Sequence, residues 1–489
     1  MLNSIIYFEE NCTEIFEKLE NDFLRNPTNF AGYVYGIMDE LYKLGREMIK
    51  ESLETMDRML QKSPVRRKKW NVEAHHSKTL TTYLGNVTFQ KTLFRNKETK
   101  EASYLLDRIL ELEPNQRLTE DAVAEMLKEA VQTSYRRGGE QTSLAEQASR
   151  QTVKNKIHAL EFPPDESAPK QKKEADCLYI DADEDHVALQ FQEKKGELIK
   201  AENGRKNNGL AVKIVYVYEG KEKSPPKGGR RELVGCHYFC GTGSGASNDA
   251  FWDGVYRYLE RNYELEKVKK IYLNADGGSW IVAGLKRIAG VTYVLDGFHL
   301  EKYLAKLTPH LKKERKEEVL EELREIIREK TKQEFKEEVK KQKKEMPEWR
   351  NQKKVDEAAE YILSNWNAAK LRLKGTEAVL GSSTESHVSH GLSDRMSSRP
   401  KGWSRQGAEK MAELRAYYLN GGDMLSLVRY QKKEKPEEEG EKELLSSAQI
   451  IRSEKNRHGE VGKYRESITH SVSEPVKKMA YFNSHIWGL

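Results

Sequence analysis

Two segments of the chain carry carboxylates at equivalent points of similar apolar runs. Tyr179-Ile-Asp-Ala-Asp183 and Tyr272-Leu-Asn-Ala-Asp276 share one pattern, and their last residues lie 93 positions apart (276 − 183). Successive side chains of a strand point to opposite faces, so Asp183 and Asp276 would emerge on one face of a sheet if the two strands are neighbours. Two acids placed in this way repel each other unless a cation lies between them. The repetition therefore predicts a divalent-metal site with oxygen ligands.

Two alternatives remain open for these acids. Asp followed by Glu-Asp or by Gly-Gly is common turn chemistry, so each carboxylate can serve a turn without binding a metal. In addition, Asp181 lies on the same strand face as Asp183, about 6.6 Å away at the rise of a strand, and is an alternative first ligand. The matching register with Asp276 favours Asp183.

A third acid is expected, because two Asp side chains leave much of the charge of two divalent cations uncompensated. Glu385 is the candidate, since it follows a small-residue turn and opens a predicted helix. Ser382-Ser-Thr-Glu385 is also a capping box, which explains the same residues without catalysis. Asp296 and His299, which follow the strand predicted over 291–295, are candidates for a supporting or DNA-contacting role, with a plain turn as the alternative.

The elements that must position these acids form a mixed sheet covered by helices. Strands are predicted over 177–182, 187–191, 212–218, 233–239, 270–275 and 291–295, with helices over 248–263 and 279–288. The charged run that follows, residues 301–374, reads as a helical insertion with paired charges four residues apart.

The first third of the chain is predicted to bind DNA. Helical periodicity covers residues 1–62, and a hairpin over 80–94 is expected to turn at Gly85-Asn86. A helix over 144–148, a short turn and a second helix over 149–156 resemble a helix-turn-helix. The expected DNA-binding residues are basic or amide side chains: Arg66, Arg67, Lys68, Lys69, Arg136, Arg137, Arg150, Gln151, Lys154 and Asn155. An ordinary charged helix face is the alternative for the last four.

The whole chain is therefore predicted to be a multidomain α+β protein. Its expected parts are N-terminal helices (1–62), a hairpin and helix-turn-helix-like region (63–160), a proline-rich linker (161–175), the first part of the core (176–300), the helical insertion (301–374), the last part of the core (375–430) and a polar C-terminal region (431–489).

Composition and charge limit the class of protein and its cellular compartment. The 84 basic against 78 acidic residues give a net charge of only +6, so charge alone does not indicate a nucleic-acid binder. Four cysteines are too few for a disulfide framework in 489 residues. No signal peptide and no apolar run of about 20 residues is present, so a soluble, cytoplasmic protein without membrane contact is expected. Cys236 and Cys240 flank His237, but zinc would need a fourth ligand, and a buried strand is favoured.

The order strand–Asp, strand–Asp, helical insertion, helix–Glu resembles the DDE transposases of bacterial insertion sequences. Three blocks together are similar to the ISLre-type transposases: Tyr179-Ile-Asp-Ala-Asp-Glu-Asp-His-Val-Ala-Leu-Gln190, Asn274-Ala-Asp-Gly-Gly-Ser-Trp-Ile281 and Leu295-Asp-Gly-Phe-His-Leu-Glu-Lys-Tyr-Leu304. The resemblance implies a ribonuclease H-like core and a catalytic triad of Asp183, Asp276 and Glu385.

The same resemblance implies two Mg²⁺ or Mn²⁺ ions and double-stranded DNA, namely the ends of the element and its target. Cleavage and strand transfer at paired ends make a homodimer in the DNA complex an expectation. Two rival functions remain at this point: a metal-dependent DNA nuclease without strand transfer, and a catalytically inactive DNA-binding regulator.

Overall fold

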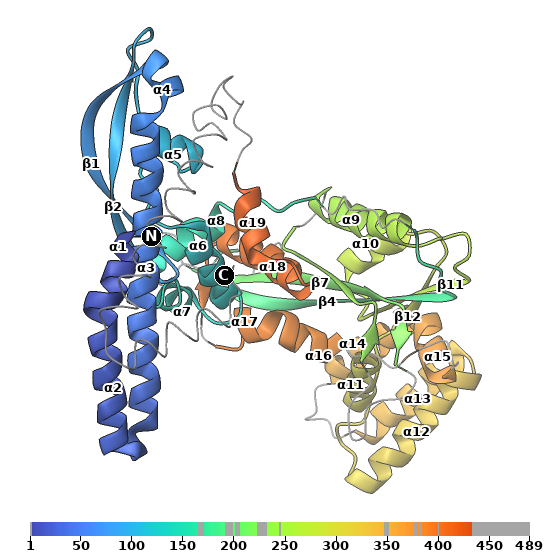
Figure 1. Ribbon diagram of the computed structural model, residues 1–489. Helices are drawn as coiled ribbons and strands as arrows, with labels where there is room; N and C mark the ends of the chain where they lie inside the picture. The colour runs from blue at the N-terminus through green and yellow to red at the C-terminus, as the bar shows by residue number, and fades with distance from the viewer. Residues whose placement is uncertain are drawn as a thin grey trace. The chain divides into compact units, whose positions relative to one another are not determined.

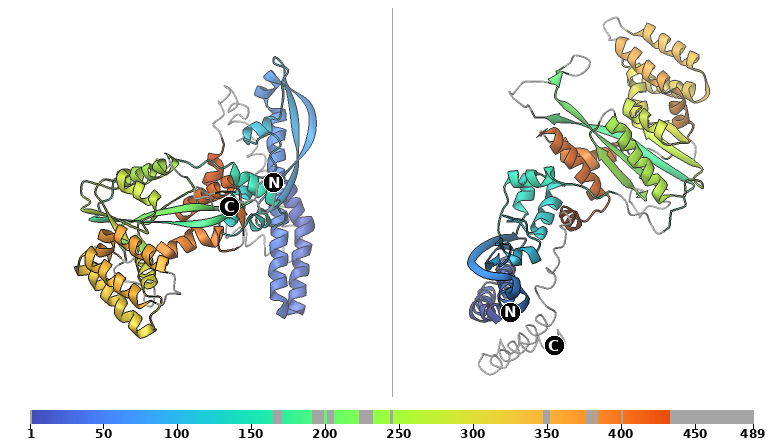
Figure 2. Two further views of the ribbon diagram at one scale, coloured as in Figure 1. Left: turned by 180° about the vertical axis from the view of Figure 1, so that it is seen from behind. Right: turned by 90° about the horizontal axis from the view of Figure 1, so that it is seen from above.

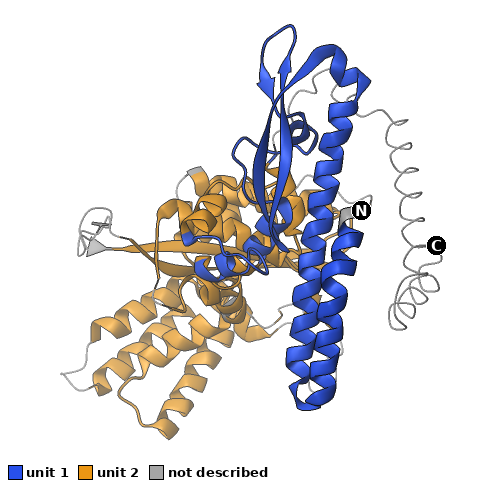
Figure 3. Cartoon of the chain, turned by 60° about the vertical axis from the view of Figure 1, so that its left-hand side comes forward, with its two compact units in different colours: residues 1–128, 136–150, 432–489 blue, residues 129–135, 151–431 orange. Residues whose placement is uncertain are grey.

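The computed structural model describes residues 2–164, 171–190, 199–200, 206–222, 232–243, 246–346, 352–375, 380, 384–399 and 401–432 (Figure 1). The chain forms two compact units (Figure 3). The first unit contains Met1–Lys128, Arg136–Arg150 and the chain from Lys432 on, and the second contains Glu129–Tyr135 and Gln151–Gln431. Among the described residues, no helix has the length and apolar character needed to cross a membrane.

The first unit begins with the predicted helices. They are α1 (Leu2–Tyr7), the π-helical η1 (Phe8–Cys12), α2 (Thr13–Arg25), the 3-10 helix η2 (Pro27–Asn29), α3 (Phe30–Lys62) and α4 (Pro64–Lys69). Helices α2 and α3 pack against each other, with the rings of Phe23 and Tyr33 stacked at 4.8 Å between centroids. The helical periodicity predicted for residues 1–62 is confirmed.

A long hairpin follows, in which β1 (Trp70–Thr82) pairs with β2 (Gly85–Asn96), and β2 with the short β3 (Ala102–Ser103). The turn lies at Tyr83 and Leu84, two residues before the predicted Gly85-Asn86, so that prediction is wrong. The Tyr83 amide donates to the Asp121 carboxylate at 2.7 Å, which fixes the turn there. Gly85 has φ +126° and already pairs with Thr82.

Four shorter helices come next: α5 (Leu105–Ile109), α6 (Glu120–Ala130), α7 (Tyr135–Glu140) and α8 (Arg150–His158). The predicted second helix of the helix-turn-helix exists as α8, but the predicted first helix over 144–148 is wrong. That stretch is a loop, because the Leu144 amide donates to the Tyr83 carbonyl at 2.8 Å and the Ala148 amide to the Gly139 carbonyl at 2.9 Å.

The second unit is built on the predicted mixed sheet, whose strand order is β10-β7-β4-β11-β12 with β13 beside the end of β4. These strands are β4 (Cys177–Leu189), β7 (Gly209–Tyr218), β10 (His237–Gly241), β11 (Lys270–Ala275), β12 (Val291–Leu295) and β13 (Gly402–Trp403). Strand β7 runs antiparallel to β4, whereas β11 and β12 run parallel to it. Short ladders join β5 (Ile199–Lys200) to β6 (Lys206–Asn207) and β8 (Gly220–Lys221) to β9 (Leu233–Val234).

Two strand boundaries differ from prediction. The expected strands over 177–182 and 187–191 form one strand, β4, because β7 pairs with it continuously from Tyr179 to Ala188; residue 191 lies outside the described part of the chain. The strand expected over 233–239 is instead divided between β9 and β10, with Gly235 in the left-handed region at φ +65° between them.

The two faces of the sheet carry different side chains, as the alternation predicts. Leu178, Ile180 and Ala182 join the fully buried Trp252 in an apolar core under α9 (Ala246–Asn262) and α10 (Ser279–Arg287), which lie side by side on that face (Figures 1 and 2). The opposite face carries a layer of tyrosines, which consists of Tyr179, Tyr216, Tyr218 and Tyr272. We call this side the tyrosine face.

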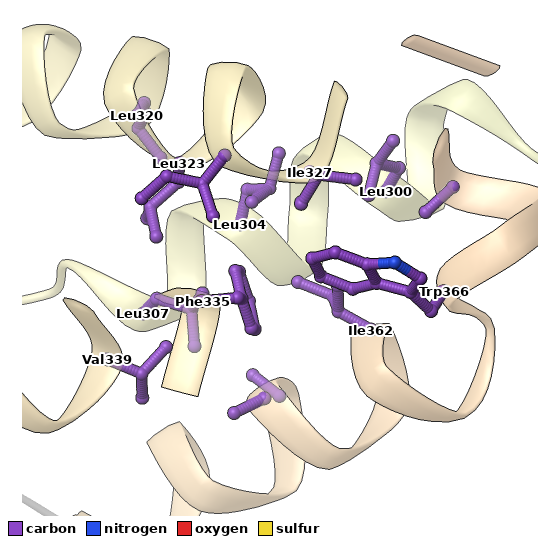
Figure 4. Close-up of a cluster of buried hydrophobic side chains, with 14 of the residues drawn as sticks. Leu300, Leu304, Leu307, Leu320, Leu323, Ile327, Phe335, Val339, Ile362 and Trp366 are labelled. Carbon is purple, nitrogen blue, oxygen red and sulfur yellow. The ribbon is translucent and has the colours of Figure 1, made fainter. Parts of the chain in front are cut away.

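The predicted helical insertion is present as α11 (Gly297–Leu307), α12 (Lys313–Glu329), α13 (Lys332–Glu345), α14 (Gln352–Ser364) and α15 (Trp366–Lys374). Its apolar core is continuous with the end of β12 through Leu295 (Figure 4). All five helices contribute to the core residues that are labelled in Figure 4, which are Leu300, Leu304, Leu307, Leu320, Leu323, Ile327, Phe335, Val339, Ile362 and Trp366.

The chain then returns through α16 (Thr384–Val388), the π-helical η3 (Ser389–Ser393) and α17 (Asp394–Met396) to β13, α18 (Arg405–Leu419) and α19 (Met424–Tyr430). The unit boundary differs from the predicted linker at 161–175. Helix α8 belongs to the second unit, where the His158 carbonyl accepts from Gln406 at 3.2 Å and the Glu161 amide donates to Gln431 at 2.8 Å. Beyond Lys432, the expected C-terminal region lies outside the described residues.

Candidate active site

The two acid-bearing strands are neighbours in the predicted register. Strand β4 pairs in parallel with β11 so that Asp181 lies opposite Asn274 and Ala182 opposite Ala275. Asp183 and Asp276 follow directly, on strands about 4.8 Å apart. The condition on which the metal-site hypothesis depends, that the two strands are neighbours, is therefore met.

Asp183 lies within a strand and not in a turn. It pairs with Ile214 of β7, and its Oδ1 accepts from the Glu184 amide at 2.8 Å. Burial raises the pKa of the Asp183 carboxyl to about 6, and the negative charges of Asp276 and Asp296 add to this effect. A carboxylate held in this state is the kind of group that a cation stabilises.

Asp276 is the first residue after β11 and does serve a turn. Its Oδ1 accepts from the Gly278 amide at 2.9 Å, and Gly277 between them has φ +87°. Its carbonyl accepts from the Tyr361 hydroxyl of α14 at 2.5 Å. The helical insertion therefore anchors the backbone that carries this acid.

The charges of Asp296 and His299 interact with those of the two strand-end acids. Asp296 caps α11, since its Oδ2 accepts from the His299 amide at 3.0 Å and lies 3.2 Å from His299 Nδ1. The hydrogen bond to Asp296 raises the pKa of His299 above its ordinary value, and the charges of Asp183 and Asp276 raise it further. The three carboxylates thus stabilise the protonated form of His299 relative to that of an isolated imidazole.

Asp181 is a buried structural carboxylate. The hydroxyls of Tyr216 and Tyr218 donate to it at 2.7 and 3.3 Å, and the Asn274 amide donates at 2.7 Å. Arg372 of α15 then donates to Asn274 Oδ1 at 2.7 Å. Because both oxygens of Asp181 accept hydrogen bonds from the protein, this arrangement favours Asp183 as the first metal ligand.

Glu385 lies in the first turn of α16, as predicted, but its side chain and Ser382 lie outside the described residues. Two positions further on, His387 stacks on Tyr216 at 4.4 Å between centroids and lies 2.9 Å from the Tyr238 hydroxyl. Helix α16 therefore packs on the tyrosine face, the face that also carries Asp183. Among the described side chains, no three His, Cys, Asp or Glu residues form a group that could hold a metal ion.

The predicted DNA-binding residues fall into three kinds. Arg66 is buried and donates to the carbonyls of Leu60 at 3.1 Å and Trp70 at 3.0 Å, so its guanidinium holds the fold together. Arg67, Lys68, Lys69, Arg150, Gln151 and Asn155 are exposed, and Lys154 is half-buried. Arg136 and Arg137 are exposed and both pair with Glu140, at 2.9 and 2.8 Å.

Of the two cysteines near β10, Cys240 lies within the strand and Cys236 directly precedes it. Cys240 is buried in β10, and burial raises the pKa of its thiol to about 12. The ring of His237 stacks on Tyr258 at 4.0 Å between centroids.

Sequence reasoning missed the residues that support the acids. The alternation of Tyr216 and Tyr218 on one strand face is a signal for a polar layer beneath Asp181. The role of Arg372 has no local signal, because it reaches Asn274 and the Leu295 carbonyl, 98 and 77 residues away.

Residues 23–434 match the family described as Uncharacterised protein family (UPF0236). The chain belongs to this family. A UPF0236 protein of Caldanaerobacter subterraneus subsp. tengcongensis is 35% identical over 423 residues, which cover 86% of this chain and 85% of that protein. A second UPF0236 protein of the same organism is 33% identical over 424 residues, 87% of this chain and 84% of its own, and its name covers eleven loci of that genome.

Proposed function

We propose that this UPF0236 protein is an insertion-sequence transposase of the ISLre type, which cleaves DNA at the ends of its element and joins them to a target. The observation that carries the proposal is the shared register of β4 and β11, which brings Asp183 and Asp276 to neighbouring positions on one face of the sheet. A charged pair of this kind is costly in a fold unless it binds something.

Three further observations support the proposal. The mixed sheet, with β4 central between the antiparallel β7 and the parallel β11, and β12 parallel beyond β11, is compatible with the ribonuclease H-like core that the proposal requires. The helix that carries Glu385 packs on the face of the acids through His387. Relatives present at eleven loci of one genome fit a mobile element.

The three carboxylates fit Mg²⁺ or Mn²⁺, because such ions prefer carboxylate oxygens as ligands. A bound cation would also favour the ionised form of Asp183, which burial of this side chain disfavours. Asp183, Asp276 and Glu385 would hold the ions. When bound, a pair of divalent ions supplies an activated water or 3′-hydroxyl and charge compensation for the leaving oxygen.

The chain's own residues then supply position and charge. Asp183 is fixed by strand pairing on β4, and Asp276 by Gly278 and Tyr361. His299, whose ring nitrogen Nδ1 lies 3.2 Å from Asp296, would favour negative charge nearby when it is protonated. The exposed Arg67, Lys68 and Lys69 of α4 and the polar face of α8 would bind the DNA backbone and base edges.

The test uses DNA that carries the flanking ends of the protein's own gene, incubated with Mg²⁺, Mn²⁺ or EDTA. We expect nicking and joining at those ends with either metal, and a loss of at least 100-fold in the Asp276→Asn variant. Asp253→Asn is the matched control: Asp253 lies half-buried on α9, where it pairs with Arg287 at 3.2 Å, and this variant should retain activity.

The products decide between the proposal and its rivals. Cleavage without joined products would identify a nuclease. Specific binding to the ends without cleavage under any metal would identify a regulator and assign Asp276 to its turn alone.

A further inference from the structure

One face of the hairpin in the first unit carries only uncharged side chains that form hydrogen bonds. It consists of three cross-strand pairs of β1 and β2, which are Ser77 and Gln90, Thr79 and Thr88, and Thr81 and Asn86. Thr81 is half-buried and the other members are exposed. We call these six residues the ribbon face. Since 33% of the residues in this chain are charged, a strand face that is merely solvated would be expected to include charges.

The opposite face of the hairpin is the one that folds the unit. Leu80, Val87 and Phe89 alternate with the residues of the ribbon face and are buried in one core with Leu60 of α3. Helix α3 also lies along the edge of β2, where Glu54 accepts from the Gln90 amide at 3.1 Å (Figure 1). The ribbon face therefore lies on the side of the hairpin that this core does not use.

We propose that the ribbon face enters the major groove of duplex DNA and contacts the base edges there. The major groove is about 12 Å wide and admits a two-stranded ribbon, whose strands are about 4.8 Å apart. Hydroxyl and amide groups match the donors and acceptors of the bases, and Gln90 can pair in bidentate fashion with an adenine. From Ser77 to Thr81 the face extends over about 13 Å, which corresponds to about four base pairs.

Two cross-strand contacts orient side chains of the ribbon face. The Thr81 hydroxyl donates to Asn86 Oδ1 at 2.7 Å, which leaves the Asn86 NH₂ group as a donor for acceptors such as guanine O6 and N7. The hydroxyl oxygens of Thr79 and Thr88 lie 2.8 Å apart, and a hydroxyl that donates to its neighbour still accepts. Side chains that are ordered in advance lose less rotamer entropy when DNA binds.

The cations that DNA binding requires lie at the open end of the same hairpin. The exposed basic residues 67–69 end α4 directly before β1. The Lys97 amide donates to the Lys69 carbonyl at 2.8 Å, which brings the exposed Lys97 to the same end, followed by the exposed Glu98. Along β1, Lys69 lies about 26 Å from Ser77, less than one turn of B-DNA, which is about 34–36 Å. The hairpin thus separates groups for phosphates from groups for bases.

This inference deepens the proposed function and rests on it for the identity of the DNA, the ends of the element. The basic end of the hairpin would supply affinity for any duplex, and the ribbon face would supply the preference for one sequence. Duplex RNA does not fit the ribbon, because the major groove of an A-form helix is deep and narrow.

The first test measures binding of the full chain in EDTA, so that no strand is cut, at about 0.15 M salt. The two ligands are DNA with the flanking ends of the protein's own gene and a shuffled sequence of the same composition. The variant Thr88→Val with Gln90→Ala removes two base-contacting groups, and valine keeps the branched shape that strands favour. We expect its affinity for the ends to fall by about tenfold or more, with the affinity for shuffled DNA and the salt slope unchanged.

The matched control is Thr28→Ala with Gln333→Ala, which removes a hydroxyl and an amide from exposed positions outside the hairpin and should bind as the unmodified chain does. Circular dichroism checks that the hairpin variant is folded. If it is not, Gln90→Ala alone is measured, with a loss in the same direction expected. An unchanged preference for the ends in the folded hairpin variant, or no preference in the unmodified chain, would overturn the inference and leave the face to solvent or to a protein partner.

Dimethyl sulfate footprinting tests the groove, because the reagent methylates guanine N7 in the major groove and adenine N3 in the minor groove. We expect protection of guanine N7 within a segment of about four base pairs, lost in the hairpin variant. Protection at adenine N3 alone would contradict the inference. Because no metal is present, the result is separate from strand cleavage: cleavage of the ends by a chain whose footprint does not depend on the hairpin would refute this inference and leave the proposed function intact.

Discussion

At the scale of single residues, Asp183 differs from an ordinary surface carboxylate in its protonation. Its folded pKa is raised from 3.8 to about 6, chiefly by burial. Between these two values the folded chain binds more protons than the unfolded chain, so the free energy of unfolding falls as the pH rises through this window. The charged Asp183 therefore destabilises the metal-free protein at neutral pH.

We predict that Asp183→Asn stabilises the metal-free protein at pH 7.5 by up to about 3 kcal/mol, because the amide carries no charge to bury. The gain should shrink as the pH falls towards about 4, where the carboxyl of the unfolded chain is also protonated. Urea unfolding in EDTA at several pH values measures it. Asp253→Asn is the control; it removes a partly exposed ion pair with Arg287 and should lower stability by no more than about 1 kcal/mol. A loss of stability in Asp183→Asn at pH 7.5 would contradict the prediction.

At the scale of elements, the turn between β11 and α10 joins the sheet to the helical insertion. A Cβ added to Gly277 would lie 2.8 Å from Asn365 Oδ1 and 2.9 Å from the Tyr293 hydroxyl. An added Cβ would displace the side-chain ends of Asn365 and Tyr293 or shift the turn, which carries Asp276 one residue earlier. Any shift of the turn moves the acid.

We predict that Gly277→Ala lowers metal-dependent DNA cleavage at least tenfold, because either the turn or the Asn365 and Tyr293 side chains packed against it must move to relieve the contact. Gly290→Ala is a close control, since Gly290 also has a positive φ, +75°, but no atom lies within 4 Å of an added Cβ. Both variants bear the cost of the positive φ, about 1 kcal/mol. Equal activity in the two variants would show that the contact with the insertion does not position Asp276.

The elements also show what the sequence can predict. The alternation along Tyr179 to Asp183 and Tyr272 to Asp276 predicted the division of the two faces, because a strand has a strict two-residue period. The adjacency of the two strands was an assumption, which the pairing of β4 with β11 now supplies. The continuation of β4 past Asp183 was not predictable, since a charged run reads as a turn and only the partner β7 keeps it extended. Likewise, Arg66 reads as part of a basic cluster, but its guanidinium satisfies distant carbonyls.

At the scale of the whole molecule, the small net charge of +6 conceals an uneven distribution of accessible cations. Of the four basic residues 66–69, three are exposed, whereas the exposed Arg136 and Arg137 are partly neutralised by Glu140. Affinity for DNA depends on cations that are free to replace counterions at phosphates.

We predict that replacing Arg67, Lys68 and Lys69 with Gln weakens binding to all DNA sequences and reduces the slope of log K against log salt by up to about 2.7. Replacing Arg136 and Arg137 with Gln should change the slope less per residue, because each already has a carboxylate partner. Fluorescence anisotropy across a salt series measures both. A slope that is unchanged in the first variant would remove α4 from the DNA interface.

The unbroken strand β4 and the turn after β11 hold the two acids in different ways. Pairing with β7 fixes the backbone of Asp183, and because ordering a mobile residue costs about 1–2 kcal/mol, Asp183 needs little further ordering to bind a cation. Asp276 depends on a second element as well, since its carbonyl accepts from the Tyr361 hydroxyl of α14. A movement of the helical insertion would therefore change the separation of the two carboxylates by displacing Asp276 alone.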